Sequence, residues 1–361
     1  ESESEGDESE SEGDESESGN GSKDAGELTT ILSNMENDDL SKGVGESIAQ
    51  EVVNTAKTSQ YVNFTDEYDK VKLLEERMWS SEHEAKKFED TVSHMTAPVQ
   101  KDIERAICAK SISTWANGHR RGKLHGSSLS RLTTGDDRVF RKKIVNKSKD
   151  VAISLVIDCS GSMSGSRITL ACQAALTLSM VLDRLRINHE VCGFTTETMP
   201  QEAHDKMYQD QKTHGVKYAR MVSVVMPIFK LFGKNLDMPT KRRITGMVTN
   251  GYASAIMNSN CDGESIAMAA KRLASQKEAR KIMIVLSDGM PACWGSADFN
   301  KHLRDTVKSL EKSGMDVVGI GINSRCVESF YSKSIYVDDV NALPTVVAKQ
   351  LKSMLIAGAN K

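Results

Sequence analysis

Residues 151–167, VAISLVIDCSGSMSGSR, constrain the fold of this chain more than any other stretch. The first seven of them are largely apolar and rich in β-branched residues, which is typical of a buried strand. Asp158, Ser160 and Ser162 follow on a turn that contains glycine, and a long apolar segment with helical periodicity comes next. A buried strand that passes through a polar turn into a core helix favours a parallel α/β sheet.

Strands and helices alternate through the rest of the chain. Further strands are predicted at HEVCGFTT, KIMIVLSDG, MDVVGIGI and SIYV. Helices are predicted at RITLACQAALTLSMVLDRLR, TKRRITGMVTNGYASAIM, GESIAMAAKRLASQ, DFNKHLRDTVKSLEKSG and NALPTVVAKQLKSMLIAG. Residues 197–239 are predicted to be an irregular excursion, with helix signals in RMVSVVMPIFKLF. We therefore predict a Rossmann-like α/β fold over residues 150–361, with a doubly wound, mostly parallel sheet covered on both faces.

An acidic repeat opens the chain. Residues 1–18 repeat ESEGDES and contain ten acidic residues, no basic residue and no apolar side chain. Such a segment cannot bury enough surface to offset its ordering entropy, so residues 1–46 are predicted to be a disordered acidic linker. Solubility is its expected role, and docking of a partner is the alternative. The chain begins with Glu rather than Met, as a fragment or a processed product would.

Residues 47–149 are predicted to form a helical and basic segment ahead of the sheet. Helices are expected near residues 65–93 and 97–117, where apolar residues recur three and four apart. DRVFRKKIV is expected to be a strand beside the one that starts at Val151. Residues 118–149 carry ten Lys and Arg against two Asp but few aromatic residues. That composition favours an acidic protein partner, or the chain's own acidic tail, over nucleic acid.

Cysteine usage and hydropathy indicate the compartment. The seven cysteines form no CxxC pair and lie mostly in apolar segments, which is the pattern of free thiols in a reducing compartment. No signal peptide is recognisable, and no apolar run is long enough to span a bilayer. We therefore expect a cytoplasmic protein with no membrane partner.

Three polar turns, DCSGS, NSNCDGES and SDG, are expected to meet at one edge of the sheet, because the carboxyl ends of parallel strands lie together. Their oxygen-bearing side chains are, in chain order, Asp158, Ser160, Ser162, Asn260, Asp262 and Asp288. An all-oxygen set suits a hard cation such as Mg²⁺. The eight histidines show no HxxxH or HExxH spacing, so neither zinc nor cobalt binding by this chain is favoured.

The buried strand before DCSGS, the core helix after it and the later strand that ends in SDG resemble the von Willebrand factor A-type (VWA) domain with its metal-ion-dependent adhesion site (MIDAS). In that family two serines and a loop Thr bind Mg²⁺, with help from carboxylates that bind directly or through water. The Thr has no obvious counterpart here, and its region offers Asn260 or Asp262 first, then Thr195 and Thr196. The metal ligands implied by the resemblance are Asp158, Ser160, Ser162, Asp262 and Asp288.

A narrower resemblance covers about residues 95–361. The motifs DCSGSM, VCGFTT, NCDGES and IVLSDGMP, the approach RRGKL…SRL…VFRKK and the acidic segment upstream resemble the CobT subunits of aerobic cobaltochelatase. The resemblance implies cobalamin biosynthesis, in an oligomeric ring assembly with a AAA+ ATPase, CobS, and a large corrin-binding subunit that together insert Co²⁺. No GxxxxGK[ST] phosphate loop is present, so ATP is expected to act only through the partner. We expect a non-catalytic adaptor subunit that docks the ATPase through Mg²⁺.

An enzyme of another class is the first alternative. GSMSG fits the GxSxG pattern of α/β-hydrolases, and Asp288 and His302 follow Ser164 in the order of a triad. Ser164, however, lies seven residues beyond the last strand residue, Ile157, rather than directly after the strand. Cys159 lies inside the first polar turn and is a possible nucleophile, but no candidate base is near it in sequence. Packing in the core is its expected role.

A second alternative keeps the same domain and changes its partner. VWA domains also act with MoxR-type AAA+ ATPases, which remodel or activate proteins and have no chelatase activity. Such a protein needs the same Mg²⁺ site and the same basic face, so the sequence of this chain does not separate the two. A plain adhesion module is a third hypothesis, and the cysteine pattern and the acidic linker argue against it.

Overall fold

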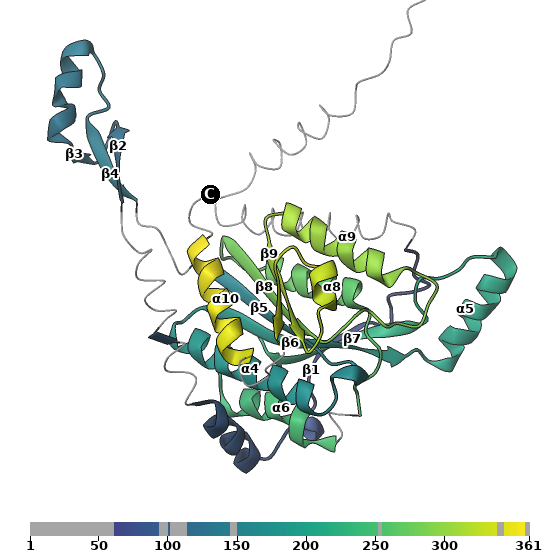
Figure 1. The fold of residues 1–361 in the computed structure, drawn as a ribbon. Helices are drawn as coiled ribbons and strands as arrows, with labels where there is room; N and C mark the ends of the chain where they lie inside the picture. Colours follow the sequence, from purple (N-terminus) through teal and green to yellow (C-terminus); the bar gives the residue numbers. More distant parts are fainter. Residues whose placement is uncertain are drawn as a thin grey trace, which may run out of the picture.

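Seven strands form the main sheet of the computed structural model (Figure 1), which describes residues 61–93, 100–101, 114–144, 150–251, 255–337 and 343–357. Their order across the sheet is β1-β7-β6-β5-β8-β9-β10. Neighbouring strands are parallel except β6 and β7, which are antiparallel. The strands are β1 (Lys70–Leu73), β5 (Val151–Asp158), β6 (Asn188–Thr198), β7 (Val222–Lys230), β8 (Arg280–Ser287), β9 (Asp316–Ile322) and β10 (Ser334–Val337). The predicted mostly parallel α/β sheet is confirmed.

Helices cover both faces of this sheet (Figure 1). On one face, α4 (Ser166–Arg184) contacts α6 (Met238–Thr249) and α10 (Leu343–Ala357). On the other face, α8 (Asp262–Ala274) packs beside α9 (Phe299–Lys312). Four of these helices fall where the sequence pattern predicts them, whereas α6 ends at Thr249, before the end of the helix predicted at TKRRITGMVTNGYASAIM.

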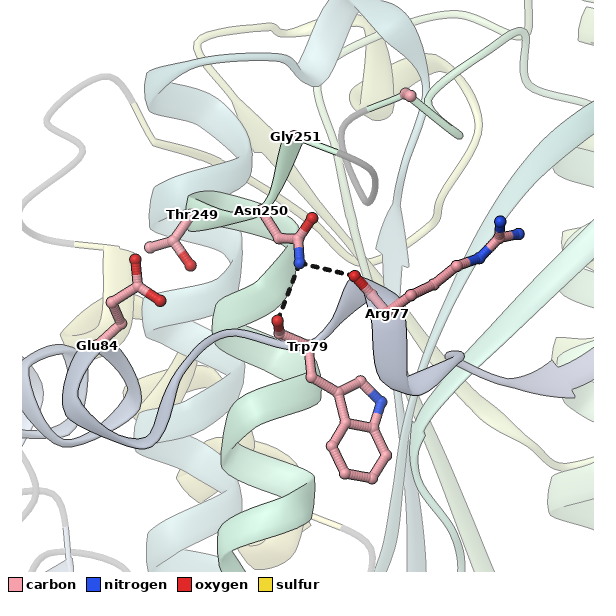
Figure 2. Close-up of a pocket in the computed structure, with 7 residues that line it drawn as sticks. Arg77, Trp79, Glu84, Thr249, Asn250 and Gly251 are labelled. Atoms are coloured by element: carbon pink, nitrogen blue, oxygen red, sulfur yellow. Dashed lines mark hydrogen bonds between the residues drawn. The ribbon is translucent and has the colours of Figure 1, made fainter.

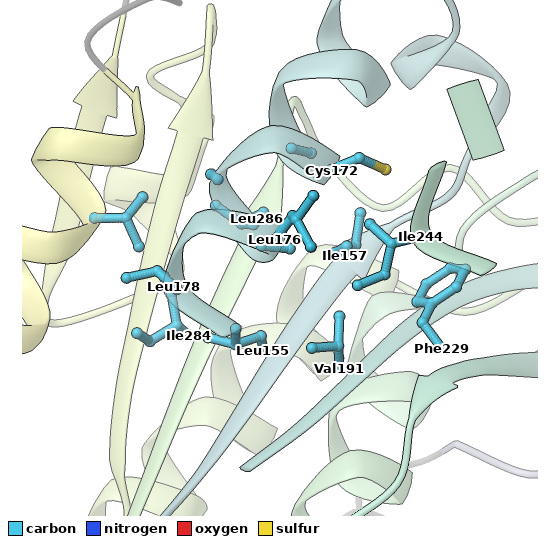
Figure 3. Close-up of a cluster of buried hydrophobic side chains, with 14 of the residues drawn as sticks. Leu155, Ile157, Cys172, Leu176, Leu178, Val191, Phe229, Ile244, Ile284 and Leu286 are labelled. Atoms are coloured by element: carbon cyan, nitrogen blue, oxygen red, sulfur yellow. The ribbon is translucent and has the colours of Figure 1, made fainter. Parts of the chain in front are cut away.

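The central strand β5 divides its side chains between two hydrophobic cores. Leu155 and Ile157 lie in the core beneath α4 (Figure 3), whereas Ala152 and Val156 lie in the core beneath α8 and α9. Every residue of β5 is buried, which explains its continuous apolar sequence. Each fully buried aliphatic side chain contributes about 1.5–3 kcal/mol relative to an exposed one. The two cores therefore fix the position at which β5 ends, on Asp158.

The segment that precedes residue 79 is a strand and a tight turn rather than a helix. Lys70–Leu73 form β1, an edge strand parallel to β7, and Glu76–Met78 form a 3-10 turn, η1. Helical structure starts at residue 82 and continues through residue 93. The run KVKL has the two-residue period of a strand, and pairing with β7 supplies hydrogen bonds that a surface helix would have to make internally.

The second helix predicted in this region, at residues 97–117, is wrong at its end. Residues 100–101 are helical, but β2 (Thr114–His119) is a strand, and residues 102–113 lie outside the described part of the chain. Residues 197–239 are also regular, since α5 (Gln201–His214) and β7 occupy most of them. β7 is buried along nearly its whole length, and periodicity alone does not distinguish such a strand from a buried helix.

DRVFRKKIV contributes β4 (Phe140–Ile144), but not to the main sheet. β4 pairs with β2 and with β3 (Lys123–Leu124) in a separate three-stranded antiparallel sheet. A 3-10 segment, η2 (Gly126–Thr134), lies between β3 and β4. The expectation that this strand lies beside β5 is wrong, because β6 and β8 already occupy the two sides of β5.

The predicted acidic linker, residues 1–46, lies outside the described residues. The predicted start of the sheet domain at residue 150 stays a prediction, and β1, from the segment before it, belongs to the same sheet. No helix among the described residues is both long enough and apolar enough to cross a membrane.

Candidate metal centre

The first polar turn is organised by the carboxylate of Asp158. One oxygen, Oδ1, accepts a hydrogen bond from the backbone N–H of Ser160 at 2.8 Å. The other, Oδ2, accepts one from the hydroxyl of Ser287, at the end of the adjacent strand β8, at 2.7 Å. A carboxylate that bonds the backbone two residues on closes a tight turn. Asp158 therefore joins the first turn to the third, and it is fully buried.

Three oxygen-bearing side chains follow one another at the mouth of this edge. The hydroxyls of Ser160 and Ser162 lie 3.0 Å apart. Ser162 Oγ donates to Asp288 Oδ1 at 2.9 Å, and Arg167 Nη1 donates to Asp288 Oδ2 at 2.8 Å. Ser162 is exposed and the Arg167 side chain is 38% exposed, so this end of the cluster is open to solvent.

The second polar turn enters through Asp262, the first residue of α8. Asn260 Nδ2 donates to Asp262 Oδ1 at 2.7 Å and to the carbonyl oxygen of Met290 at 3.3 Å. Asn260 Oδ1 accepts from the N–H of Ala292 at 3.0 Å. Both ends of the Asn260 amide thus hold the second turn to the loop that follows Asp288. The sequence left undecided whether Asn260 or Asp262 is the second-turn ligand. The Asn260 amide is used at both ends in these hydrogen bonds, whereas Asp262 has a carboxylate that could also bind a cation.

Of the other sequence alternatives, Thr195 uses its hydroxyl in structural hydrogen bonds, and Thr196 makes one through its backbone carbonyl. Thr195 Oγ1 donates to the carbonyl of Ile256 at 3.1 Å and accepts from the N–H of Asn258 at 3.0 Å. The carbonyl of Thr196 accepts from Asn258 Nδ2 at 3.1 Å. The carbonyl of Asn258 in turn accepts from the N–H of Gly161 at 2.7 Å. The two threonines therefore anchor the segment that supports the first turn.

The electrostatics of the cluster favour uptake of a cation. Burial, with a smaller contribution from the charge of Asp288, raises the pKa of Asp158 to about 6 despite the hydrogen bonds from Ser160 and Ser287 that lower it. Burial raises the pKa of Asp262 well above its usual range, with the charges of Asp158 and Asp288 adding to the effect. Three buried carboxylates that repel one another are an unfavourable arrangement that a divalent cation offsets. The donor set, all oxygen, fits a hard cation such as Mg²⁺.

The predicted ligands are brought together unequally. Hydrogen bonds connect Asp158, Ser160, Ser162 and Asp288 through the first and third turns, whereas Asp262 is reached only through Asn260. Within the described parts of the chain, no group of three or more His, Cys, Asp or Glu side chains is placed so that it could hold a metal ion by itself. A metal at this edge would therefore depend on the two serine hydroxyls as well as on the carboxylates.

Cys261 and Cys293 form a disulfide. The expectation of seven free thiols is therefore wrong for this pair, which joins the residue before Asp262 to the loop after Asp288. The two cysteines are 32 residues apart in sequence, so no local motif announces the pairing. Of the other described cysteines, Cys159, Cys172 and Cys192 are buried and free, and Cys326 is partly exposed and free.

Cys159 has the core role that the sequence indicates. Its Sγ lies against Gly193, where an added Cβ would come within 2.6 Å of the sulfur. Burial raises the pKa of its thiol well above the ordinary value, with the neighbouring Cys172 and Asp158 adding to the shift. A thiol that stays protonated is a poor nucleophile.

The hydrolase triad is not assembled. His302 is buried in α9 and stacks on the ring of Tyr61 with 3.8 Å between ring centroids. Asp288 is instead engaged by Ser162 and Arg167, and Ser164 is exposed. The structure separates the three residues into different environments.

Sequence reasoning did not find a hollow of about 600 Å³ beside α6 (Figure 2). Asn250 Nδ2 donates to the carbonyls of Arg77 and Trp79, both at 2.9 Å, and so ties η1 to the end of α6. Gly246 permits this contact, because an added Cβ would lie 2.2 Å from the carbonyl oxygen of Met78. These features account for packing, and no sequence motif falls on the hollow.

Known proteins resemble this chain in sequence family and, more distantly, in sequence and fold. The family described as the VWA domain of cobalamin biosynthesis protein CobT matches residues 139–357. The uncharacterized protein YojO of Bacillus subtilis is 24% identical over 289 residues, 76% of this chain. The chain spans only 40% of the length of that relative.

Among solved structures, the pilus adhesin SpaC of Lactobacillus rhamnosus GG in its open conformation aligns with a TM-score of 0.40 and 15% identity over 57% of this chain and 30% of the adhesin. A second crystal form of the adhesin gives a TM-score of 0.38 and 14% identity over the same shares. The match to the CobT domain covers more than half of the chain and includes all three polar turns. The chain therefore belongs to the family described as the VWA domain of cobalamin biosynthesis protein CobT.

Proposed function

We propose that this chain is the CobT-like adaptor subunit of an ATP-dependent cobaltochelatase. In this proposal the three polar turns hold Mg²⁺ as a MIDAS, and the bound metal docks a AAA+ ATPase of the CobS type. The ATPase and a large corrin-binding subunit then carry out insertion of Co²⁺ into the corrin. The observation that supports the proposal most is the row of oxygens from Ser160 through Ser162 to Asp288 at the open edge of the sheet.

The proposed Mg²⁺ ligands differ in their exposure to solvent. Ser162 is the exposed ligand of this set, whereas Ser160, Asp288, Asp158 and Asp262 are buried. Asp158 also fixes the position of Ser160 through its backbone bond. Arg167 already pairs with Asp288 in this structure, so metal binding requires the guanidinium to share or release that carboxylate.

The coordination chemistry explains why a partner is needed. Mg²⁺ prefers six oxygen ligands in octahedral geometry and rarely receives all of them from one protein. Bound Mg²⁺ would supply an open position for a carboxylate of the partner. The exposed side of Ser162 leaves room for such a ligand.

Two serines of the same loop provide a matched test of the metal. Ser162→Ala removes an oxygen of the cluster, whereas Ser164→Ala removes an exposed hydroxyl two residues before α4 and outside the cluster. Mg²⁺ is expected to raise the Tm of the wild type and of Ser164→Ala, and to have at least tenfold weaker effect, by apparent Kd, on Ser162→Ala, since a ligand that binds only the folded state stabilises it. Equal Mg²⁺ responses in both variants would show that Ser162 is not a ligand of the metal.

The partner is tested by affinity capture from the native lysate in Mg²⁺ and in EDTA, with bound proteins identified by mass spectrometry. A AAA+ ATPase recovered with a large chelatase subunit in Mg²⁺, and lost in EDTA, is the expected result. A AAA+ ATPase with an unrelated client would favour the MoxR-type remodelling function. Recovery of no ATPase in either buffer would contradict docking altogether.

A further inference from the structure

The loop that follows Asp288 displays two large apolar side chains to solvent. We call residues 289–298 the rim loop. Trp294 is 72% exposed and Met290 is 56% exposed, and among the large hydrophobic side chains of the described residues these are the two most exposed. A soluble domain gains nothing in stability from leaving such side chains in water, and exposed apolar groups beside a polar site commonly mark contact surfaces.

The backbone of the rim loop is held firmly at several points. Asn260 and Ala292 exchange both backbone hydrogen bonds at 3.2 Å, and the disulfide joins the next residue, Cys293, to Cys261. The carbonyl of Trp294 accepts from the N–H of Met221 at 2.7 Å. The two exposed side chains are therefore presented by a backbone whose position is fixed.

The residue after Trp294 shows how close this attachment is. An added Cβ at Gly295 would lie 1.8 Å from the carbonyl oxygen of Ala219, so only glycine fits there. Ser296 then donates through both its N–H, at 3.3 Å, and its hydroxyl, at 2.6 Å, to the carbonyl of Tyr218. A rigid backbone that carries a free tryptophan lowers the entropy cost of binding, because little remains to be ordered.

The rim loop and the candidate metal centre share parts. The same amide group, Asn260 Nδ2, bonds the carbonyl of Met290 and the carboxylate of Asp262. Cys261, which is covalently joined to the loop, is the residue before Asp262. An occupant that reaches the exposed hydroxyl of Ser162 is therefore expected to meet the rim loop as well.

We propose that the rim loop is the apolar half of the docking surface for the AAA+ ATPase, a proposal that rests on the proposed function. The occupant is a loop of the ATPase that carries an acidic residue with a large apolar residue close to it. Charge selects the acidic residue, since a divalent cation with an open position and the guanidinium of Arg167 both call for a carboxylate. The apolar residue packs on Trp294, and Met290 adapts to its shape.

The test measures the affinity of the full chain for the purified AAA+ ATPase recovered by affinity capture. Trp294→Ser is expected to weaken binding in Mg²⁺ at least tenfold, as loss of an interface tryptophan commonly does. Met290→Ser is expected to weaken it less, and Trp294→Phe to retain most of it. Tyr208→Ser, at a side chain 53% exposed on α5, is the matched control and should bind like the wild type. The Mg²⁺ affinity and Tm of all variants are measured in parallel and should be unchanged.

Each remaining outcome decides between the two proposals. If the wild type binds in Mg²⁺ and not in EDTA while Trp294→Ser binds equally well, the rim loop is not the docking surface and metal docking stands. If the wild type does not bind the ATPase in either buffer, both proposals fail. If Trp294→Ser changes only self-association in sedimentation velocity, the loop contacts a second copy of this chain, and the assignment to the ATPase is overturned.

Discussion

Two clusters of carboxylates each include a residue from the first turn of α8, and each cluster pairs with one arginine in a different way. Glu264 belongs to the first cluster, together with Asp66 and Asp69, and all three surround the guanidinium of Arg220. The Arg220 side chain is only 2% exposed. Its nitrogen atoms lie 3.2 Å from a carboxylate oxygen of Asp66, 2.6 Å from one of Asp69 and 2.8 Å from one of Glu264. In this cluster, which we call the arginine cluster, all three carboxylates pair with the same guanidinium.

The second cluster is the candidate metal centre, with Asp262 two residues earlier in the same helix. Its carboxylates, Asp158, Asp262 and Asp288, receive one cation, Arg167, which pairs with Asp288 alone and is partly exposed. Buried charge without a full counter-charge costs stability unless a ligand supplies it. At the start of the same helix, one guanidinium pairs with all three carboxylates of the arginine cluster but with only one carboxylate of the candidate metal centre, so the candidate metal centre is where a further cation is expected.

Loss of Arg220, the centre of the arginine cluster, should cause the largest loss of stability. Arg220→Met leaves three carboxylates around a buried site and is expected to destabilise the chain by about 3–5 kcal/mol. Arg167→Met, at the metal centre, is expected to cost less than about 1 kcal/mol because that ion pair is partly in solvent. Urea denaturation of both variants in EDTA measures the difference. Similar losses would show that the two clusters are built alike.

The covalent link at the metal centre is the next largest expected effect. The double variant Cys261→Ser/Cys293→Ser is expected to lose about 2–4 kcal/mol, as removal of a disulfide usually does. The control is Cys326→Ser, a free cysteine outside both clusters. Urea midpoints with and without a dithiol reductant check the prediction, since the reductant should lower the midpoint of the wild type and leave that of the double variant in place.

Two carboxylates in the first turn of α8, Glu264 and Asp262, allow one matched substitution in each cluster. Glu264→Gln removes charge from the arginine cluster and is expected to destabilise the chain by about 1–3 kcal/mol, because a hydrogen bond to a charged group is weakened. Asp262→Asn relieves repulsion and keeps an oxygen for Asn260, so its stability in EDTA should equal or exceed that of the wild type. In Mg²⁺ the order should change, since Asp262→Asn should lose most of the stabilisation by the metal. Thermal unfolding in EDTA and in Mg²⁺ measures both, and a stabilising Glu264→Gln would contradict the reasoning.

The smallest effect comes from a buried histidine outside both clusters. Burial lowers the pKa of His189 to about 3, and the nearby charge of Lys230 adds to the shift. The unfolded chain therefore takes up a proton near pH 6.5 that the folded chain refuses, so stability is full above that pH and falls as the pH drops toward 3. At pH 5 the expected loss is about 2 kcal/mol. Urea denaturation at pH 5 and pH 7 checks it, and His189→Gln should show a shallower slope.

The predictable parts of the fold are those in which the local sequence pattern is compatible with only one type of secondary structure. β5, β8 and β9 are short apolar runs that end in polar turns, and α9 carries an amphipathic pattern with Asp298 accepting from the N–H of Lys301 at its start. β1 and β7 were not predictable in this way. Their pairing brings Val71 beside Met226, 155 positions along the chain, and no local pattern encodes that contact.

The candidate site divides along the same line. The meeting of Asp158, Ser160, Ser162 and Asp288 follows from parallel strands that end at one edge, which the sequence pattern already indicates. The choice between Asn260 and Asp262 depends on which amide hydrogen bonds form with Met290 and Ala292. Those bonds exist only once the rim loop has folded back on the second turn, as the disulfide also requires.

The amide of Asn260 couples the candidate metal centre to the rim loop. It holds Asp262 with the same nitrogen that holds the rim loop, so the two cannot move independently. If the proposed cation and the proposed partner both bind, a ligand that shifts the loop would change the affinity of the edge for the cation, and the cation would change the affinity of the loop for its ligand by the same factor. One side-chain amide is thus enough to make occupancy at either place a signal at the other.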